Sequence, residues 1–386
     1  MRICYSLDNY DRASGGAALA ARGLAHHLAD LGHELSILQP GRDADYADGT
    51  IQVHSRKLRR PYLYRQHDRD TLGWNRQWRH TVADYLDQNP TDLLITQNRL
   101  LYSSVDAAAE RNIPSVIWAH AYRLFCPDQF FQRDPLEQCQ GNCAACTGGT
   151  FGQAAKDNLQ AYQHGLQQAS LIMANSHYMA KVTKHLTGRE APVVYPTFDL
   201  DDWRQAGSSE RDHILFIKPQ ERKGFSIFLD IAKAMPDKTF VVAGKTGSSA
   251  KRALRPLNNV STIEWSNEMR GVYAHTQVLI GPSIWPEPFG RVFVEAASAG
   301  VPSITSNRGG IPEAVGAGGI LIDDIYDIDA WVNALRSMDD PQTSRTLATL
   351  ARAHACKFSS KTVGQTLRDS VLAATGLDLS VGTHRN

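Results

Sequence analysis

The chain has 386 residues, of which 42% are hydrophobic, so it is long enough for two or three domains with buried cores. Its 41 lysine and arginine residues nearly balance its 40 aspartate and glutamate residues, which argues against nucleic acid or another polyanion as a general partner. The sequence opens on a strand-like segment without a signal-peptide layout, and no apolar run reaches about 18 residues. We therefore expect a cytoplasmic protein.

Strand-like runs alternate with helical patterns in the first half of the chain, which is typical of a parallel sheet covered by helices. These runs are residues 2–7, 34–38, 92–96, 115–120, 171–175 and 192–194. A polar stretch after Pro196 is typical of a linker, and a second alternating series begins at His213. Each half therefore has the elements of a doubly wound domain. After residue 327 the pattern is helical to about residue 375.

Two glycines, Gly15 and Gly16, stand between the first strand and the helical pattern that follows it. Adjacent glycines let the backbone approach a ligand closely, and a helix N-terminus favours an anion. A tight turn without a ligand is the alternative. The spacing does not form G-x-G-x-x-G, so the fingerprint of a dinucleotide-binding domain is absent.

Residues 56–79 form the most basic stretch, with eight lysine and arginine residues against Asp68 and Asp70 and with aromatic residues between them. Three interpretations stay open: a clamp for an anionic acceptor such as a lipid-linked phosphate, a contact with an anionic membrane surface, and a solvated face.

Four cysteines lie close together in a turn-rich insert over residues 126–146, with the spacing C-x12-C-x3-C-x2-C. They are Cys126, Cys139, Cys143 and Cys146. Four thiolates can bind a structural zinc ion tetrahedrally, although only the last pair has an ordinary zinc spacing. Free thiols and disulfides are the alternatives.

Residues 278–300 contain an apolar strand, a loop broken by proline and glycine, and a helix that begins near Arg291. In open α/β sheets ligands bind at the carboxyl ends of strands, and a helix N-terminus freed by Gly290 suits a phosphate. Glu287 lies in the loop, and Glu295 follows Arg291 by four residues. The alternative is that Glu295 only pairs with Arg291 and that Glu287 is a solvated carboxylate.

The segment EPFGRVFVE resembles the E-x7-E motif of the retaining GT-B glycosyltransferases of family 4, and the following VPSITSNRGGIPEAVG resembles the next stretch of that family. The resemblance implies two Rossmann-like, doubly wound parallel-sheet domains that face each other across a cleft. We expect an acceptor-side domain over 1–198, a donor-binding domain over 199–360, and a C-terminal helix over 361–386 that packs back on the first domain.

The resemblance also implies roles for single residues. The first glutamate of the motif, Glu287, touches the donor sugar, and the second, Glu295, holds the ribose. The implied catalytic residues are Glu287, His120 and Lys223. The implied donor-binding residues are Gly15, Gly16, Lys218, Lys223, Pro288, Phe289, Gly290, Arg291, Glu295, Gly309, Gly310 and Glu313. His120 ends an apolar strand, where a purely structural histidine is the alternative.

The family's usual Gly-Arg pair is absent, since Ile217 and Lys218 stand in its place. Lysine keeps the charge but not the bidentate fork of arginine, so its contact with a phosphate differs in geometry. The resemblance implies that Lys218 and Lys223 stabilise the departing diphosphate, so that catalysis needs no divalent metal. Two solvated lysines are the alternative.

The implied activity is transfer of a sugar from a UDP- or GDP-linked donor to a hydroxyl of a glycan or lipid-linked acceptor, with retained configuration. The expected setting is the synthesis of a cell-surface polysaccharide or glycoconjugate, with peripheral contact to the inner membrane face through residues 56–79. The alternatives are a nucleotide-sugar epimerase of the same fold and a catalytically silent sugar-nucleotide-binding protein. A nicotinamide oxidoreductase is disfavoured because the dinucleotide fingerprint is missing.

Overall fold

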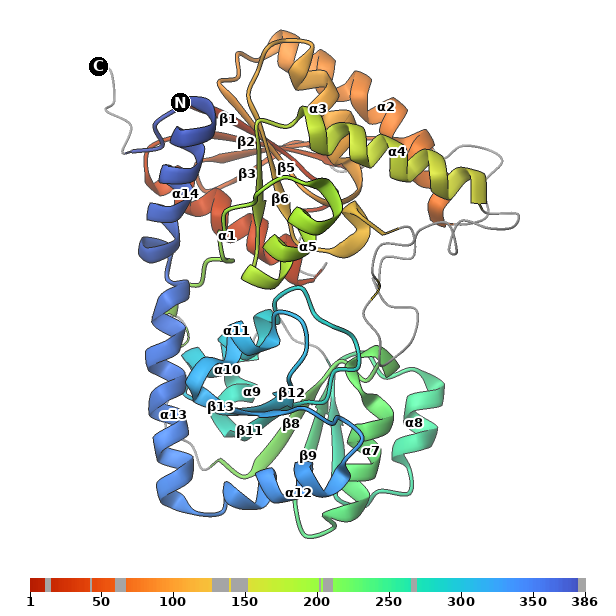
Figure 1. Ribbon diagram of the computed structural model, residues 1–386, viewed down its shortest axis with the longest axis vertical. Helices are drawn as coiled ribbons and strands as arrows, with labels where there is room; N and C mark the ends of the chain where they lie inside the picture. Colours follow the sequence, from red (N-terminus) through yellow and green to blue (C-terminus); the bar gives the residue numbers. More distant parts are fainter. Residues whose placement is uncertain are drawn as a thin grey trace. The chain divides into compact units, whose positions relative to one another are not determined.

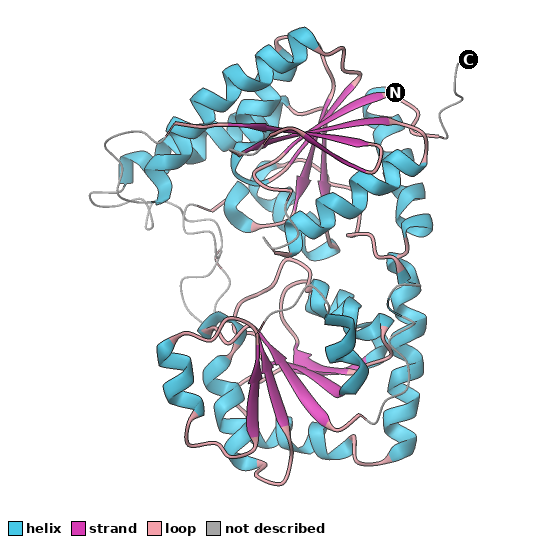
Figure 2. Ribbon diagram, turned by 180° about the vertical axis from the view of Figure 1, so that it is seen from behind, coloured by secondary structure: helices cyan, strands magenta, loops and turns pink. Residues whose placement is uncertain are grey.

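The computed structural model describes residues 1–10, 15–41, 44–59, 67–126, 139, 152–200, 203, 211–264 and 269–380, and for 67–72, 123 and 152–158 it describes the backbone alone. These residues form two compact units. The first unit contains the described residues up to 197 together with 360–380, and the second contains those from 198 to 359. Each unit is built on one sheet with helices on both faces, as Figure 2 shows.

The sheet of the first unit has seven strands in the order β3-β4-β2-β1-β5-β6-β7. All neighbours are parallel except β3 and β4, which are antiparallel. The strands are β1 (Arg2–Ser6), β2 (Glu34–Pro40), β3 (Tyr46–Asp48), β4 (Ile51–Arg56), β5 (Leu93–Thr96), β6 (Ser115–Ala119) and β7 (Leu171–Ala174). Residues 192–194, predicted as a strand, contribute only an isolated bridge from Val193 to Ala174. The strands β3 and β4 were not predicted.

The helices of the first unit cover this sheet on both faces. They are α1 (Gly16–Asp30), α2 (His67–Gln88), α3 (Leu101–Ala109), α4 (Gly152–Gln168), α5 (His177–Thr187) and α14 (Ser360–Thr375), with short 3-10 turns η2 (Asn98–Leu100) and η3 (Tyr122–Leu124). Successive residues of β1 point to opposite faces of the sheet, as strand geometry requires. Ile3 and Tyr5 pack in a core with residues of α1 and α14, whereas Cys4 packs with residues of α2 and α3.

The last helix, α14, belongs to the core of the first unit although it follows the second unit in the sequence. Val363, Leu367 and Val371 recur every four residues, so they share one face of the helix, and all three are buried. Figure 1 shows α14 beside α1, where a side chain at Gly364 would collide with the ring of His27. The chain thus returns to complete its first unit.

The sheet of the second unit has six strands, all parallel, in the order β10-β9-β8-β11-β12-β13. They are β8 (His213–Ile217), β9 (Phe240–Ala243), β10 (Val260–Ile263), β11 (Thr276–Gly281), β12 (Ser303–Ser306) and β13 (Gly319–Ile322). The helices are α7 (Phe225–Ala234), α8 (Ser248–Leu254), α9 (Met269–His275), α10 (Arg291–Ser298), α11 (Ile311–Val315), α12 (Ile328–Ser337) and α13 (Pro341–Ala355). The turns η5 (Glu221–Lys223), η6 (Gly316–Gly318) and η7 (Cys356–Phe358) are 3-10 helices.

Each sheet has a point where the strand order reverses. In the first unit β1 lies between β2 and β5, and in the second β8 lies between β9 and β11. Ligands of open α/β sheets bind outside the carboxyl ends of the strands at such a point. The loops that follow β1 and β5, and those that follow β8 and β11, are therefore where a site is expected in each unit.

Candidate active site

Two loops at the carboxyl edge of the second sheet are joined through one carbonyl group. The loop after β8 contains Arg222, whose carbonyl oxygen accepts hydrogen bonds from the backbone N–H of Ile284 (3.1 Å) and of Trp285 (3.0 Å). The hydroxyl of Ser283 donates to the same oxygen at 3.3 Å. The loop after β11 is therefore held against the turn that starts α7.

Gly224 explains how closely these loops approach. Its φ of 78° lies in the left-handed region, and a Cβ atom there would stand 1.8 Å from the carbonyl oxygen of Pro282. Only glycine fits both the backbone angle and the contact. The Lys-Gly pair in the sequence thus combines a cation with the residue that lets the second loop come near.

A third loop, after β12, supports the backbone of Glu287. Gly309 has a φ of 61°, and a Cβ atom there would lie 2.3 Å from the carbonyl oxygen of Glu287. The N–H of Gly310 donates to this same oxygen at 2.7 Å. The two glycines of the Gly-Gly-x-P-E segment therefore fix the position from which the Glu287 side chain projects.

Lys223 and Glu287 form a nearly buried ion pair, with 2.5 Å between Nζ and Oε1. Their side chains are only 17% and 9% exposed, so the interpretation of Glu287 as a solvated turn carboxylate is wrong, as is that of Lys223 as a solvated lysine. Lys218 is half-buried, and its φ is 60°. Burial lowers the pKa of Lys218, and the nearby Lys223 lowers it further, while Glu287 and Glu295 oppose the shift.

Glu295 is buried and pairs with Arg291 at 2.9 Å, one helical turn earlier on α10. The hydroxyl of Tyr273 donates to its second oxygen at 3.4 Å. Burial raises the pKa of Glu295, and the charge of Arg291 works against that rise. The pairing that the alternative predicted is present. It leaves acceptor positions on the carboxylate for a ligand, since a carboxylate has about four.

The remaining residues of the second unit that were predicted to bind the donor have different structural roles. Gly290, with a φ of 101°, is the N-cap residue directly before α10. Phe289 is buried and packs edge-on against the ring of Phe358 at 5.4 Å, so it supports the loop from within. Pro288 lies against the Gly310 turn, and the backbone oxygen of Glu313 on α11 lies 2.8 Å from His354 Nε2.

In the first unit, Gly15 is the N-cap residue of α1 and has a φ of 111°, and Gly16 is the first residue of the helix. A Cβ atom at Gly15 would meet nothing within 4 Å. The start of α1 is tied to the end of β5, because Gln97 Nε2 donates to the carbonyl oxygen of Ala17 at 3.2 Å. The hydroxyl of Tyr5 donates in turn to Gln97 Oε1 at 2.9 Å. Gln97 therefore positions the glycine turn.

His120 lies directly after β6 and is 7% exposed. Its ring packs against that of Trp118, with 4.1 Å between centroids, because residues two positions apart point to the same face of a strand. Asn175 follows the neighbouring strand β7, and its Nδ2 lies 3.5 Å from His120 Nδ1. The structure thus brings a histidine and an amide together at the carboxyl edge of the first sheet.

Two of the four predicted zinc ligands, Cys143 and Cys146, lie outside the described residues, while Cys126 is buried and Cys139 is partly buried. Within the described part of the chain, no three His, Cys, Asp or Glu side chains gather as a metal site. The zinc site stays a prediction for this insert.

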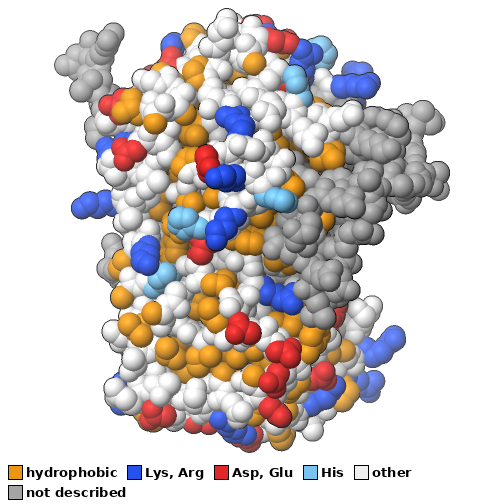
Figure 3. Space-filling model, in the orientation of Figure 1, with side chains coloured by type: hydrophobic (Ala, Val, Ile, Leu, Met, Phe, Trp, Pro, Cys, Tyr) orange, Lys and Arg blue, Asp and Glu red, His pale blue; other side chains and the backbone are white. Residues whose placement is uncertain are grey.

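The basic stretch is divided between β4 and α2, and residues 60–66 of it lie outside the described residues. Arg56 pairs with Asp45 at 2.7 Å, and Arg79 pairs with Glu110. On the face drawn in Figure 3, positive and negative side chains of the described residues lie interspersed. No helix in the described ranges is both long and apolar enough to span a bilayer.

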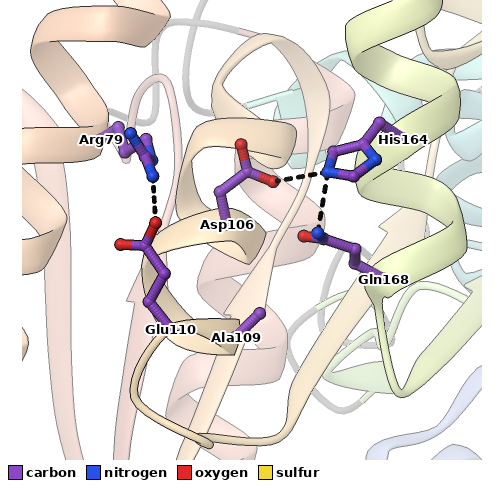
Figure 4. A pocket seen from close by; sticks show the side chains of 6 residues that line it. All are labelled: Arg79, Asp106, Ala109, Glu110, His164 and Gln168. Carbon is purple, nitrogen blue, oxygen red and sulfur yellow. Dashed lines mark hydrogen bonds and ion pairs between the residues drawn. The ribbon is translucent and has the colours of Figure 1, made fainter.

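A cavity of about 350 Å³ lies elsewhere, between α2, α3 and α4, as Figure 4 shows. Asp106 Oδ1 lies 4.0 Å from His164 Nε2, and burial raises the pKa of Asp106. Arg79 pairs with Glu110 beside them. Asp106, Ala109 and Glu110 lie toward the C-terminal end of α3, which follows β5. The cavity is therefore on the side of the sheet where the strands begin, and not at its carboxyl edge.

Several residues were not predicted as site residues. Gln97, Asn175, Arg222 and Trp285 lie in segments that follow strands, and Tyr273 contacts Glu295. Two carry a sequence signal that could have found them. Asn175 directly follows an apolar strand, as His120 does, and Arg222 directly precedes Lys223. The contact between Tyr273 and Glu295 joins α9 to α10, and no local pattern announces it.

Models of known protein families match both units of the chain. The model of Glycosyltransferase Family 4 matches residues 14–202, and the model of glycosyl transferases group 1 matches residues 211–339. A D-inositol 3-phosphate glycosyltransferase from Mycobacterium sp. (strain JLS) is 30% identical over 230 residues, which are 51% of this chain and 51% of that protein. The chain spans about half the length, or less, of the first curated relatives that it matches.

Solved structures align with almost the whole chain. Sucrose-phosphate synthase from Thermosynechococcus elongatus has a TM-score of 0.73 at 17% identity and covers 96% of this chain and 99% of its own. Anabaena HepE in complex with UDP-glucose has a TM-score of 0.69 at 20% identity, with 97% and 100% covered. At such identities the likeness shows the fold, which is GT-B with two parallel-sheet domains, as predicted. Because the two family models match one unit each on this fold, the chain belongs to the GT-B glycosyltransferases, with the Family 4 model matching its first unit and the group 1 model its second.

Proposed function

We propose that this chain transfers a sugar from a nucleotide-diphosphate donor to a hydroxyl group, with retention of the anomeric configuration. The observation that carries the proposal is the cluster of Lys223, Lys218 and Glu287 at the carboxyl ends of neighbouring strands, supported by the Gly309-Gly310 turn. Cations and a carboxylate in one nearly buried place suit a ligand that carries both a diphosphate and sugar hydroxyls. Membership of the glycosyltransferases supports the same assignment.

In the proposed reaction the bond between the sugar C1 and the phosphate oxygen breaks, and the acceptor oxygen forms the new bond to C1 on the same face. The acceptor proton passes to the departing phosphate oxygen, so no protein base is required. The diphosphate gains negative charge as the bond breaks, and Lys218 and Lys223 stabilise that charge. Glu287 accepts hydrogen bonds from the sugar, and Glu295 accepts them from the ribose. For His120 and the glycines Gly15 and Gly16, the proposed role is donor binding.

The proposed donor carries UDP or GDP, and the structural likeness to HepE bound to UDP-glucose supports a nucleotide sugar of this kind. The proposed acceptor is a glycan or a lipid-linked molecule in the synthesis of a cell-surface polysaccharide or glycoconjugate. Peripheral contact with an anionic membrane through residues 56–79 belongs to the same proposal.

A thermal-shift screen of UDP-, GDP-, ADP- and dTDP-linked sugars tests the function. A donor at 100 times its Kd should raise the free energy of unfolding by about 2.7 kcal/mol. The responding donor is then incubated with and without acceptor extracts, and the products are identified by NMR. Formation of an epimer of the donor sugar in the absence of acceptor would indicate an epimerase. Binding of the donor without turnover would indicate a silent binding protein. Absence of any shift would contradict the proposal.

Glu295→Gln should weaken the binding of the responding nucleoside diphosphate, because a charged hydrogen bond is worth about 1.5–3 kcal/mol. Burial raises the pKa of Glu295 above 4.5, so the carboxylate takes up its proton at a higher pH than a free glutamate does. The affinity advantage of the wild type over Glu295→Gln should therefore shrink as the pH falls toward that raised pKa. Calorimetry at several pH values measures this ratio.

The matched control is Asp230→Asn, which changes an exposed acid on α7 that pairs only with Lys233 among the contacts described. It should bind the nucleotide as the wild type does. Equal affinities for Glu295→Gln and the wild type at neutral pH would contradict the proposed contact between Glu295 and the ribose. This result would not contradict the proposed contacts with the diphosphate.

A further inference from the structure

One aromatic ring in the second unit lies close to two cations. Trp285 stands in the loop between β11 and α10, two residues before Glu287. Its ring centroid is 5.1 Å from the guanidinium carbon of Arg222 and 5.4 Å from Nζ of Lys223. Cations within about 6 Å of an indole ring are attracted by its quadrupole, and the attraction grows as water is excluded. Trp285 is half-buried, so part of that gain is available here.

The backbone fixes the ring relative to the turn that carries both cations. The N–H of Trp285 donates to the carbonyl oxygen of Arg222 at 3.0 Å, and Ile284 donates to it at 3.1 Å. These bonds do not involve the indole ring. A change of the Trp285 side chain therefore removes the ring beside the two cations without removing these backbone bonds between the loops.

The two cations need such a support, because both side chains are long and have many rotamers. Lys223 has a second contact in Glu287, which pulls its ammonium group toward the carboxylate at 2.5 Å. Arg222 is exposed, and its Nε donates to Gln220 Oε1 at 3.0 Å. A ring within 5.4 Å of both cations limits where their charges can go, and such preorganisation stabilises developing charge on a phosphate.

We propose that Trp285 is a positioning residue, which holds the side chains of Arg222 and Lys223 where the diphosphate of the donor binds, and that Arg222 is thereby a cation of this site alongside Lys223. The proposal rests on the proposed function. It names the diphosphate, and not the base or the sugar, as the part of the donor that depends on the ring.

Two substitutions of Trp285 separate the ring face from the volume that it fills. Trp285→Phe keeps an aromatic face, whereas Trp285→Leu keeps an apolar side chain without one. Calorimetry with UDP and GDP should show a loss on the order of tenfold for Trp285→Leu and a clearly smaller loss for Trp285→Phe. Uridine and guanosine, which lack the diphosphate, should bind both variants as they bind the wild type. Thermal denaturation of each variant shows whether it is folded.

A double-mutant cycle gives the second readout. In a chain that carries Arg222→Ala and Lys223→Ala, the further change Trp285→Leu should alter the Kd for the nucleoside diphosphate by less than about twofold, because the ring then has no cation to hold. A full tenfold effect in that background would overturn the proposal, because the ring would be acting by packing or on the ligand itself.

Three other results would overturn it as well. Equal losses for the leucine and phenylalanine variants would show that the aromatic face is not used. A matching loss for the nucleosides would show that the ring contacts base or ribose. Wild-type affinity in Trp285→Leu would show that the ring has no role, while the proposed function would stand. If the wild-type chain binds neither UDP nor GDP, both the positioning role and the proposed donor fail together.

Discussion

Lys223→Ala is expected to lower turnover by about 10²-fold or more, which is the scale seen when one preorganised donor to a developing charge is removed. The reason is its location, since Nζ lies 2.5 Å from Glu287 and the side chain is 17% exposed. Because lysine offers a fixed positive charge, we expect activity to survive EDTA. Turnover of the responding nucleotide sugar, measured with and without EDTA, checks both expectations.

Loss of Lys223 also leaves Glu287 nearly buried without its cation, so the folded state must be checked separately. Lys223→Met retains the apolar stem near Trp285 and serves as a second variant. Lys233→Ala is the matched control, because Lys233 is exposed on α7 and pairs with Asp230. If EDTA abolishes activity, Mg²⁺ or Mn²⁺ restores it and Lys223→Ala turns over like the wild type, the lysine does not have this role.

The fold could be predicted where the sequence pattern is strong. The strands β1, β5, β6 and β7 are short apolar runs that are almost wholly buried, and such runs are typical of the strands of a helix-covered parallel sheet. β3 and β4 were missed because β3 has two exposed residues among its three and β4 is buried at only two of its six. Strands that are only partly buried lack the continuous apolar run that makes the pattern visible.

The site could be predicted only in part, and the reason is distance along the chain. Glu287, Lys223 and the Gly309-Gly310 turn were named because local motifs carry them. Their meeting depends on the strand order, which places β8, β11 and β12 side by side. The pairing of Lys223 with Glu287, and the place of Trp285 beside two cations, join residues about 60 positions apart. No local pattern encodes such contacts.

Of the substitutions that we propose in the second unit to add a single methyl group, Gly224→Ala should be the most damaging. The new Cβ would stand 1.8 Å from the carbonyl oxygen of Pro282, and a φ of 78° is itself unfavourable for alanine. Relief requires the loop after β11 to move away, which breaks the contacts that Ser283, Ile284 and Trp285 make with Arg222. We expect a loss of about 3–5 kcal/mol in the free energy of unfolding, from strain and overpacking together. Calorimetry should show that nucleotide binding is lost too.

Two matched glycines separate the causes of this loss. Gly188 has a φ of 70° with nothing within 4 Å of its Cβ position, so Gly188→Ala should cost only the backbone term of about 1–2 kcal/mol. Gly271 lies within helix α9 in open space, so Gly271→Ala should be neutral or stabilising by up to about 1 kcal/mol. Chemical denaturation of the three variants ranks them. If Gly224→Ala costs no more than Gly188→Ala and still binds nucleotide, the loops do not need to touch at Gly224, and the close approach that aligns Lys223 with Glu287 is not what holds the site together.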